Sequence, residues 1–364
     1  MKAQRVVVPA SAVESWTVVD ADYATVEPAE RYLAYLAAIE RSPNTVRAYA
    51  QSLALWFEFL GLRNVGWVGA VVEDVSGFVT WLRAPAANVI VFDSSAARRA
   101  ESTVNRHLAA VFGFYDFHGR TGVVLAESLV AWRRVRRGSF KPFLHHVTKG
   151  RPIPTRPVKL TVPRRLPVTL GVEEVAVILA ACGRLRDRFL FALLAETGIR
   201  VGQALGLRHC DFVSRRCELR IVPRDDNANG ARAKTRTITT VPVSVALVRL
   251  YSEYMHTEYG DLDSDYVFVN LFSHPVGRPL RYDAVAKLVT RLRVRTGIEF
   301  TPHVLRHTRA TALIRAGVPI EIVSKMLTHR SVETTSQTYI HLGVDDVRAE
   351  LVRAGVWPAG QADR

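Results

Sequence analysis

The sequence has 364 residues, of which 48% are hydrophobic, so a disordered chain is excluded and two folded domains are expected. Its 49 Lys and Arg residues against 34 Asp and Glu residues give a net charge of +15. This charge favours a polyanionic partner over a charge that only keeps the protein soluble, and nucleic acid is favoured over a membrane as that partner. The three cysteines form no CxxC pair, and no signal peptide or membrane span stands out, which predicts a cytoplasmic, nucleoid-associated protein without a zinc ribbon.

The first predicted domain is helical and covers residues 28–132, after an N-terminal extension at 1–27. Its clearest helix is SPNTVRAYAQSLALWFEFLG, in which Ser42 is the expected N-cap, Pro43 the first helical residue and Gly61 the end. Three similar helices are expected over residues 28–40, 74–84 and 101–117. The apolar residues that recur along the clearest helix at three- or four-residue spacing are Val46, Tyr49, Leu53 and Trp56.

Residues 133–165 have a different composition and predict a linker. The segment holds eleven Lys or Arg residues, several prolines and no Asp or Glu. Proline keeps such a chain extended, and charge of one sign repels itself unless an anion lies alongside. The segment is either a solvated tether or, as we prefer, a strand that follows DNA phosphates. The residues expected to contact DNA are Arg133, Arg134, Arg136, Arg137, Lys141, Arg164 and Arg165.

A second domain with both helices and strands is predicted over residues 166–343. Two helices open it and are expected to end at Gly183 and Gly198. The runs CELRIV and TRTITTVPV predict two strands, joined by a loop with the turn signal Asn229-Gly230. Further helices are expected near residues 244–258, 282–296, 302–316 and 319–328, before a tail at 344–364 with one amphipathic helix. The predicted fold is mainly α with a small β-sheet.

Four segments of the second domain carry polar residues that a core would not select. They read ETGIRVGQALGLRHCDF, GARAKTRTITTVP, TPHVLRHTRATALIRAG and LTHRSVETTSQTYIHL. Each alone is explained equally well as solvated surface, so only their combination is informative. The candidates are Arg200, Gln203 and Asp211 in the first segment, Lys234 in the second, His303 and Arg306 in the third, and His329 and Tyr339 in the fourth.

These residue types fit an attack on a phosphodiester. Two guanidinium groups can hold the non-bridging oxygens bidentately and keep their charge at any physiological pH. A tyrosine oxygen can store the broken bond as a phosphotyrosyl ester, and a lysine can protonate the leaving oxygen. Histidines can bond to the phosphate or assist proton transfer. No metal is needed, and we find no carboxylate cluster to hold one.

In order and spacing, the segments resemble the motifs of the tyrosine recombinase (phage integrase) family across residues 166–342. The first resembles the family's first arginine box, the third its His-x-x-Arg box, and the fourth its histidine and tyrosine box. Residues 28–118 resemble the family's core-binding domain more loosely. The resemblance implies a site-specific DNA recombinase that cuts and rejoins strands through a 3′-phosphotyrosyl intermediate, without metal, cofactor or ATP.

The resemblance also implies a role for each candidate. The two arginines would clamp the phosphate, the tyrosine would be the nucleophile, the lysine the general acid to the 5′-oxygen, and the histidines would complete the set. Gln203 stands where the family often has glutamate, so Gln203 and Asp211 are expected only to support the catalytic residues. The implied catalytic residues are Arg200, Lys234, His303, Arg306, His329 and Tyr339.

The implied partners are double-stranded DNA with specific recombination sites, a homotetramer assembled on it, and accessory or partner recombinases; no membrane is involved. Three alternatives stay open. The protein could be a DNA-binding regulator without catalysis, a type IB topoisomerase with the same chemistry, or a metal-dependent hydrolase built on His303, His307 and His329. Phage integration, transposition and chromosome dimer resolution all remain open as the biological setting.

Overall fold

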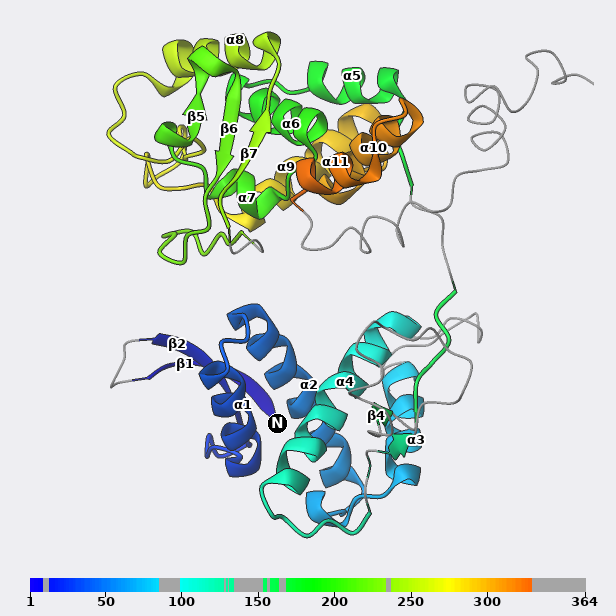
Figure 1. Ribbon diagram of the computed structural model, residues 1–364. Helices are drawn as coiled ribbons and strands as arrows, with labels where there is room; N and C mark the ends of the chain where they lie inside the picture. Colours follow the sequence, from blue (N-terminus) through cyan, green and yellow to red (C-terminus); the bar gives the residue numbers. More distant parts are fainter. Residues whose placement is uncertain are drawn as a thin grey trace, which may run out of the picture. The chain divides into compact units, whose positions relative to one another are not determined.

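The chain folds into two units, Met1–Arg164 and Arg165–Arg364, in this computed structural model (Figure 1). Buried apolar side chains form a large core in each unit. The structure describes residues 1–8, 13–84, 99–127, 129, 131–133, 153–155, 158–163, 168–233 and 237–328. The described elements are mainly helical, with small antiparallel sheets, as the sequence predicts. No helix among these residues is both long and apolar enough to cross a membrane.

The first unit, Met1–Arg164, is built around an aromatic core. Trp56 is fully buried, and its indole Nε1–H donates to Tyr115 Oη at 3.2 Å. The Tyr115 hydroxyl in turn donates to the carbonyl of Trp67 at 2.7 Å, which ties the second helix to the fourth and to a 3-10 turn, η1 (Trp67–Gly69). The helices are α1 (Glu27–Ala38), α2 (Pro43–Leu62), α3 (Val72–Arg83) and α4 (Glu101–Arg120).

Helix α2 begins as predicted and ends slightly later. Ser42 is its N-cap, and the Ser42 hydroxyl accepts a hydrogen bond from the Thr45 amide at 3.2 Å. The helix continues through Gly61 to Leu62, and the chain then turns at Asn64, whose φ is +54°. Asparagine tolerates this left-handed conformation, so Gly61 is not needed as a terminator.

The N-terminal extension is a β-hairpin, which the sequence reading missed. Strands β1 (Lys2–Val8) and β2 (Val13–Val19) pair antiparallel from Lys2 opposite Val19 to Val8 opposite Val13. Val18 is fully buried in the core of the first unit, so the hairpin is part of that unit. Tertiary packing, which local patterns do not report, fixes it there.

Part of the predicted linker also packs on the first unit. Strand β3 (Ala131–Arg133) pairs antiparallel with β4 (Ile153–Thr155). Farther along, the Asn105 side chain accepts from the Leu160 amide at 2.9 Å and donates to the Leu160 carbonyl at 2.8 Å. Leu160 also packs against the core of that unit. A tether solvated along its whole length is therefore wrong, because residues near 160 are held on the helical unit.

A buried histidine makes the stability of the first unit depend on pH. His107 is 5% exposed, its Nδ1 lies 2.9 Å from Ser52 Oγ, and burial, aided by Arg99 and Arg106, lowers its pKa from 6.5 to about 4. Between pH 6.5 and 4 the unfolded chain binds the proton more readily, so unfolding becomes easier as the pH falls through that window. We expect a loss on the order of 3 kcal/mol.

Urea unfolding of the full chain, followed by tryptophan fluorescence at pH 7 and pH 4.5, measures this loss. All tryptophans except Trp357 lie in the first unit, so the signal reports mainly on it. Buried His118, whose pKa burial also lowers, adds a loss of the same sign. His107→Gln keeps a polar partner for Ser52 but cannot titrate, so its loss should be clearly smaller. An unchanged pH dependence in this variant would contradict the assignment.

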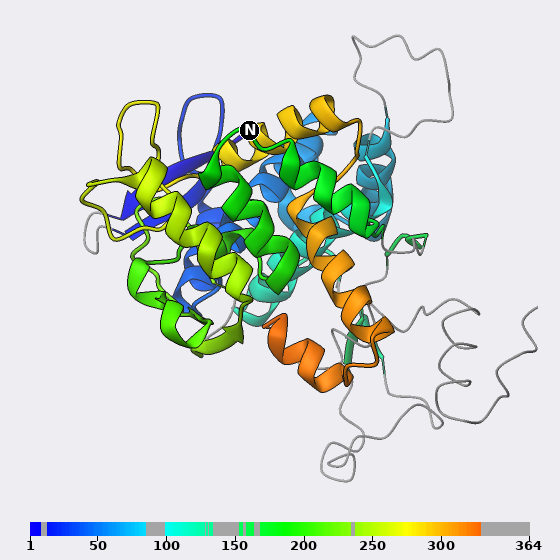
Figure 2. The ribbon, with the colours of Figure 1, turned by 90° about the horizontal axis from the view of Figure 1, so that it is seen from above.

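The second unit, Arg165–Arg364, packs around helix α6. After a charged first turn this helix is mostly apolar, with Phe189, Leu190 and Leu194 among its fully buried residues, which is typical of a central helix. It lies between α5 and α8, and α10 also contacts it (Figures 1 and 2). The helices are α5 (Val172–Ala180), α6 (Leu185–Thr197), α7 (Val201–Leu205), α8 (Val245–Tyr254), α9 (Tyr282–Thr296), α10 (Pro302–Arg315) and α11 (Ile320–Met326).

The sheet of the second unit has the strand order β5–β6–β7, all antiparallel. The two predicted strands are β6 (Glu218–Ile221) and β7 (Thr239–Pro242), while the short β5 (Phe212–Val213) and helix α7 were not predicted. Gly230 turns with φ +69°, as expected, but within the long connection 222–238 and not in a tight hairpin. Gly198 ends α6 in the left-handed conformation, whereas α5 already ends at Ala180, before Gly183.

Candidate active site

Arg200 lies at the N-cap of α7, directly after the turn that ends α6. Gly198 makes that turn with φ +67°, a conformation that glycine adopts without strain. The Arg200 Nη1 donates to Thr328 at the end of α11, to the carbonyl at 3.3 Å and to Oγ1 at 3.4 Å. Burial lowers the pKa of Arg200, but a guanidinium still keeps its proton at neutral pH.

The buried side chain of Gln203 also connects Arg200 to Thr328. It is 3% exposed, its Oε1 accepts from the Arg200 amide at 2.8 Å, and its Nε2 donates to Thr328 Oγ1 at 2.8 Å. A glutamate here could accept from the amide but could not donate to the threonine hydroxyl. The glutamine therefore keeps the acceptor for the Arg200 amide and supplies a donor to Thr328, where a glutamate would have to accept from the hydroxyl.

Arg306 is a buried cross-link. It projects from α10, is 2% exposed, and donates from Nη1 to the Gly198 carbonyl at 2.6 Å and from Nη2 to the Leu327 carbonyl at 2.7 Å. The two carbonyls follow helices α6 and α11, so one side chain holds three helices in register. Arg200, Gln203 and Arg306 thus meet at Leu327–Thr328.

Thr328 is a residue whose importance the sequence reading missed. It is 4% exposed and has φ +54°, which is unfavourable for a β-branched residue. Its side chain and carbonyl receive the contacts from Arg200 and Gln203. The next residue in the sequence is His329. The only available signal was this adjacency, because Thr and Ser recur throughout the segment.

His303 and His307 form a pair on the first turns of α10. Their Nε2 atoms are 2.9 Å apart, and the ring centroids 4.2 Å. Burial, with smaller contributions from His303 and Arg306, lowers the pKa of His307 to about 4, so His307 is neutral at pH 7. In the described part of the chain, no three His, Cys, Asp or Glu side chains form a group that could hold a metal ion.

Asp211 makes its described contacts with residues other than Arg200, Gln203 and Arg306. It is 1% exposed and receives two hydrogen bonds from Arg224, at 2.6 and 2.8 Å, and a third from the Arg208 amide at 2.9 Å. These bonds anchor the connection after β6 to the turn before β5. Its described role is therefore structural, and none of its described bonds supports Arg200.

The segment that leads to Lys234 passes next to α7. Gly202 leaves room for it, because a Cβ there would lie 2.9 Å from the Arg232 carbonyl oxygen and 2.1 Å from Tyr282 Oη. Arg232, two residues before Lys234, thus lies next to Gly202, two residues after Arg200. The other predicted catalytic residues, Lys234, His329 and Tyr339, fall outside the described part of the chain. The same holds for most of the residues expected to contact DNA, namely Arg134, Arg136, Arg137, Lys141, Arg164 and Arg165. For Arg133 the structure describes only the backbone.

The geometry predicts different stability costs for the two arginines. Arg306→Ala leaves two buried carbonyls without their partner, so we expect the second unit to lose roughly 2–5 kcal/mol of unfolding free energy. Arg200→Ala removes two longer, partly exposed contacts and should cost less than about 1.5 kcal/mol. Calorimetry of the full chain, which separates the unfolding of the two units, measures both. Equal costs would contradict the cross-link assigned to Arg306.

Two family models match the chain. Residues 169–345 match the phage integrase family, and residues 29–122 match the phage integrase N-terminal SAM-like domain. Transposase A from transposon Tn554 of Staphylococcus aureus is 40% identical over 353 residues, which is 96% of this chain and 97% of the relative. Tyrosine recombinase XerD of Mycobacterium leprae is 30% identical over 346 residues, 90% of this chain and 95% of the relative.

Solved structures share the fold at low sequence identity. The Tn1549 transposon integrase in complex with transposon right end DNA has a TM-score of 0.59 at 15% identity, covering 89% of this chain and 98% of that one. XerH site-specific recombinase bound to palindromic difH substrate has a TM-score of 0.56 at 19% identity, covering 87% of this chain and 81% of that one. The resemblance seen in the four sequence segments is confirmed: the chain belongs to the phage integrase family and is a site-specific tyrosine recombinase of the integrase and transposase type.

Proposed function

We propose that this recombinase moves a transposon, cutting and rejoining its DNA ends through a covalent link to Tyr339. Transposase A from Tn554 is related to it along almost the whole of both chains, which favours transposition over phage integration or dimer resolution. The observation that carries the site is the meeting of Arg200, Gln203 and Arg306 at Leu327–Thr328. Two guanidinium groups thereby lie beside the start of the segment that holds His329 and Tyr339.

In the proposed reaction, Arg200 and Arg306 stabilise the charge that develops on the phosphate. Such preorganised donors typically contribute about a hundred- to thousand-fold each to the rate. Arg306 is held by the Gly198 and Leu327 carbonyls, and Gln203 holds the backbone of Arg200. Their positions are therefore set before DNA arrives, so little reorganisation is needed in the transition state.

The chemical step is a transesterification. The Tyr339 oxygen attacks phosphorus and gives its proton to His303 or His329, the bond from phosphorus to the 5′-oxygen breaks, and Lys234 protonates that oxygen. His303 lies beside His307, which is neutral at pH 7. Attack of a 5′-hydroxyl from another strand reverses the step and joins the DNA. Because the phosphotyrosyl ester stores the bond energy, no ATP is consumed.

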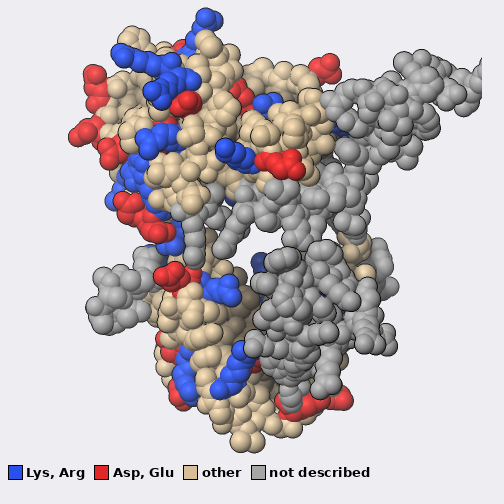
Figure 3. Space-filling model, in the orientation of Figure 1, with Lys and Arg blue, Asp and Glu red and all other residues tan. Residues whose placement is uncertain are grey.

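We propose duplex DNA with specific recombination sites as the substrate, a homotetramer on that DNA as the active assembly, and accessory or partner recombinases as further components. The net charge of +15 supports DNA as the ligand. In the view of Figure 3, basic side chains gather over the part of the second unit that holds β5 to β7, with acidic ones among them. Because the substrate is DNA, we propose the cytoplasm and its nucleoid as the place of action.

The proposal is tested with nicked DNA spanning the ends of the genomic element that encodes the protein. A nick next to the cleavage point lets the short 5′-hydroxyl strand diffuse away, which traps the covalent complex. We expect a protein–DNA adduct on a denaturing gel, insensitive to chelator, and peptide mapping should place the DNA on Tyr339. Binding without an adduct would favour the regulator that has lost catalysis, and an adduct abolished by chelator would favour the metal-dependent alternative.

A further inference from the structure

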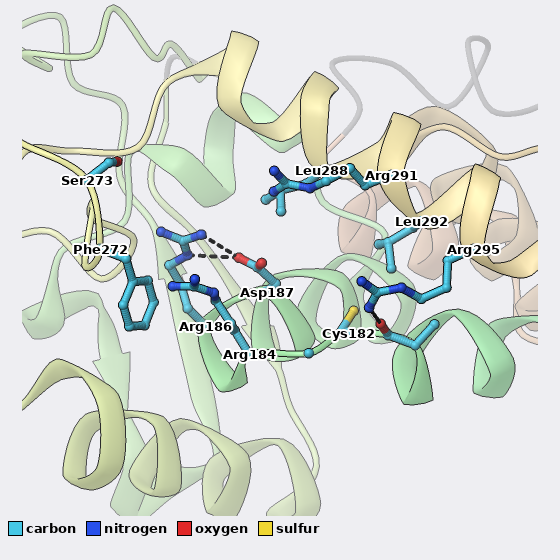
Figure 4. Close-up of a pocket in the computed structure, with 12 residues that line it drawn as sticks. Cys182, Arg184, Arg186, Asp187, Phe272, Ser273, Leu288, Arg291, Leu292 and Arg295 are labelled. Atoms are coloured by element: carbon cyan, nitrogen blue, oxygen red, sulfur yellow. Dashed lines mark hydrogen bonds and ion pairs between the residues drawn. The ribbon is translucent and has the colours of Figure 1, made fainter.

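A cavity of about 440 Å³ opens in the second unit at the N-terminal end of α6 (Figure 4). Its walls are the connection 181–184, the first turn of α6, the loop at Phe272–Ser273 and one side of α9. Arg306 contacts Gly198 beyond the opposite end of α6. Because this helix has 13 residues at about 1.5 Å each, the cavity and the Arg200 cluster are separated by roughly 20 Å.

The cavity is strongly basic. Its lining includes four arginines and a single carboxylate, Asp187, in the described part of the chain. Arg186 neutralises that carboxylate, because its Nε and Nη2 both lie 2.8 Å from Asp187 Oδ1. Arg186 also donates to the Val269 carbonyl at 3.0 Å. This ion pair belongs to the wall, and it leaves three positive charges without a carboxylate in the lining.

The other three guanidinium groups come from two elements, Arg184 from the connection 181–184 and the other two from α9, and all three line the same cavity. Arg184 stacks over the Phe272 ring, 3.4 Å from its centroid, so its N–H groups point outward from the rim of the stack. Arg295 donates one hydrogen bond to the Ala181 carbonyl at 2.5 Å, which fixes its position and uses one of five donors. Arg291 projects into the same space from one helical turn earlier on α9 (Figure 4).

The rest of the wall is uncharged. Leu288 and Leu292 are buried side chains of α9, and burial raises the pKa of the Cys182 thiol to about 12, so it stays neutral. Charges of one sign in a concave, partly apolar site repel each other more strongly than on an open surface. An anion bound among the three arginines would relieve that repulsion.

We propose that this pocket is a second phosphate-binding site, which holds a phosphate ester through Arg184, Arg291 and Arg295. Guanidinium forks match the tetrahedral oxygens of phosphate bidentately, and two or three negative charges balance three arginines better than one carboxylate does. The cavity volume exceeds that of a phosphate alone, so the ester group also fits. The source is either a free nucleotide or a DNA backbone outside the cleavage site. The proposal does not depend on the role of Tyr339.

Titration calorimetry of the full-length protein with inorganic pyrophosphate and with ADP tests the site. We expect saturable binding that the double substitution Arg184→Gln and Arg291→Gln weakens by roughly tenfold or more. Arg215→Gln, on the exposed turn η3 (Ser214–Arg216), is the matched control and should leave the affinity unchanged. The variant Arg200→Gln measures separately any phosphate binding at the Arg200 cluster, because that side chain lies at the other end of α6.

Two outcomes of the titration would overturn the proposed phosphate site. If Arg200→Gln removes the binding and the double substitution does not, phosphate binds only at the Arg200 cluster and the pocket is a solvated surface. The absence of saturable binding in the wild type would overturn it equally. Adduct formation on a short nicked substrate should persist in the double variant, so failure of this site and failure of the recombinase proposal are distinguishable.

The same variants separate the two sources of phosphate. If the ester belongs to DNA, pyrophosphate should compete with long duplexes but not with short ones, and the double variant should lose affinity only for the long duplexes. If the ester belongs to a free nucleotide, ADP should bind equally well to the preformed protein–DNA complex. Both results support a phosphate site in this pocket.

Discussion

Tyr339→Phe is expected to abolish the covalent protein–DNA adduct and to leave DNA binding within about twofold of the wild type. The substitution removes a single oxygen and little packing, so the fold should persist. Without that oxygen no phosphotyrosyl ester can form, and cleavage falls to zero and not merely to a lower rate. The measurements are adduct formation on nicked DNA in a denaturing gel and affinity by fluorescence anisotropy, at one salt concentration because phosphate contacts are salt-dependent.

A matched control is Tyr23→Phe, which removes the same oxygen from a tyrosine that is 74% exposed in the other unit. It should form the adduct at the wild-type rate. If Tyr339→Phe still forms an adduct that resists denaturation, another side chain is the nucleophile. Loss of DNA binding together with the adduct would instead show that the hydroxyl is needed for docking.

Local signals predicted most of the fold correctly. Ser42 begins α2 as a cap whose hydroxyl meets the Thr45 amide, and Gly198 ends α6 because only a left-handed residue continues the chain there. Such features depend on a few neighbouring residues, so the sequence carries them directly. The same holds for α9, which spans the predicted residues 282–296.

Contacts distant in sequence could not be predicted in this way. The β1–β2 hairpin is held by Val18 in the first core, and the connection 222–238 is held by Asn229, which donates to the Leu205 carbonyl at 3.0 Å and the Leu280 carbonyl at 2.8 Å. Asn229-Gly230 was predicted as a turn from local preference alone. The turn is present, and the Asn229 side chain also ties the connection to α7, which only the folded structure reveals.

In the candidate site, too, the sequence indicated the important residues but not their contacts with distant parts of the chain. The order of the four segments and the family that they resemble singled out Arg200 and Arg306, since paired guanidinium groups suit a phosphate. The sequence could not tell that Arg306 is buried and holds two backbone carbonyls, or that Gln203 donates to Thr328. For Asp211, which was expected to support the catalytic residues, the described bonds are to Arg224 and to the Arg208 amide.

Lys234→Ala is expected to slow cleavage of ordinary DNA by about 10²–10⁴-fold, the usual contribution of a general acid. Without the lysine, the 5′-oxygen must leave as an unprotonated alkoxide. Lys234→Arg should be nearly as slow, because a guanidinium keeps its proton at neutral pH. We expect this role for Lys234, and Arg232, two residues before it, lies against Gly202 of α7.

Substrate chemistry separates the acid from a mere phosphate contact. When the bridging 5′-oxygen is replaced by sulfur, the leaving group becomes a stable thiolate that needs no proton. Lys234→Ala and Lys234→Arg should then cleave at close to the wild-type rate. Arg200→Ala should gain no comparable rescue, since it lacks charge stabilisation of the transition state and not a proton. If sulfur fails to rescue Lys234→Ala, the lysine only contacts phosphate, and His303, paired with neutral His307, becomes the first candidate for the acid.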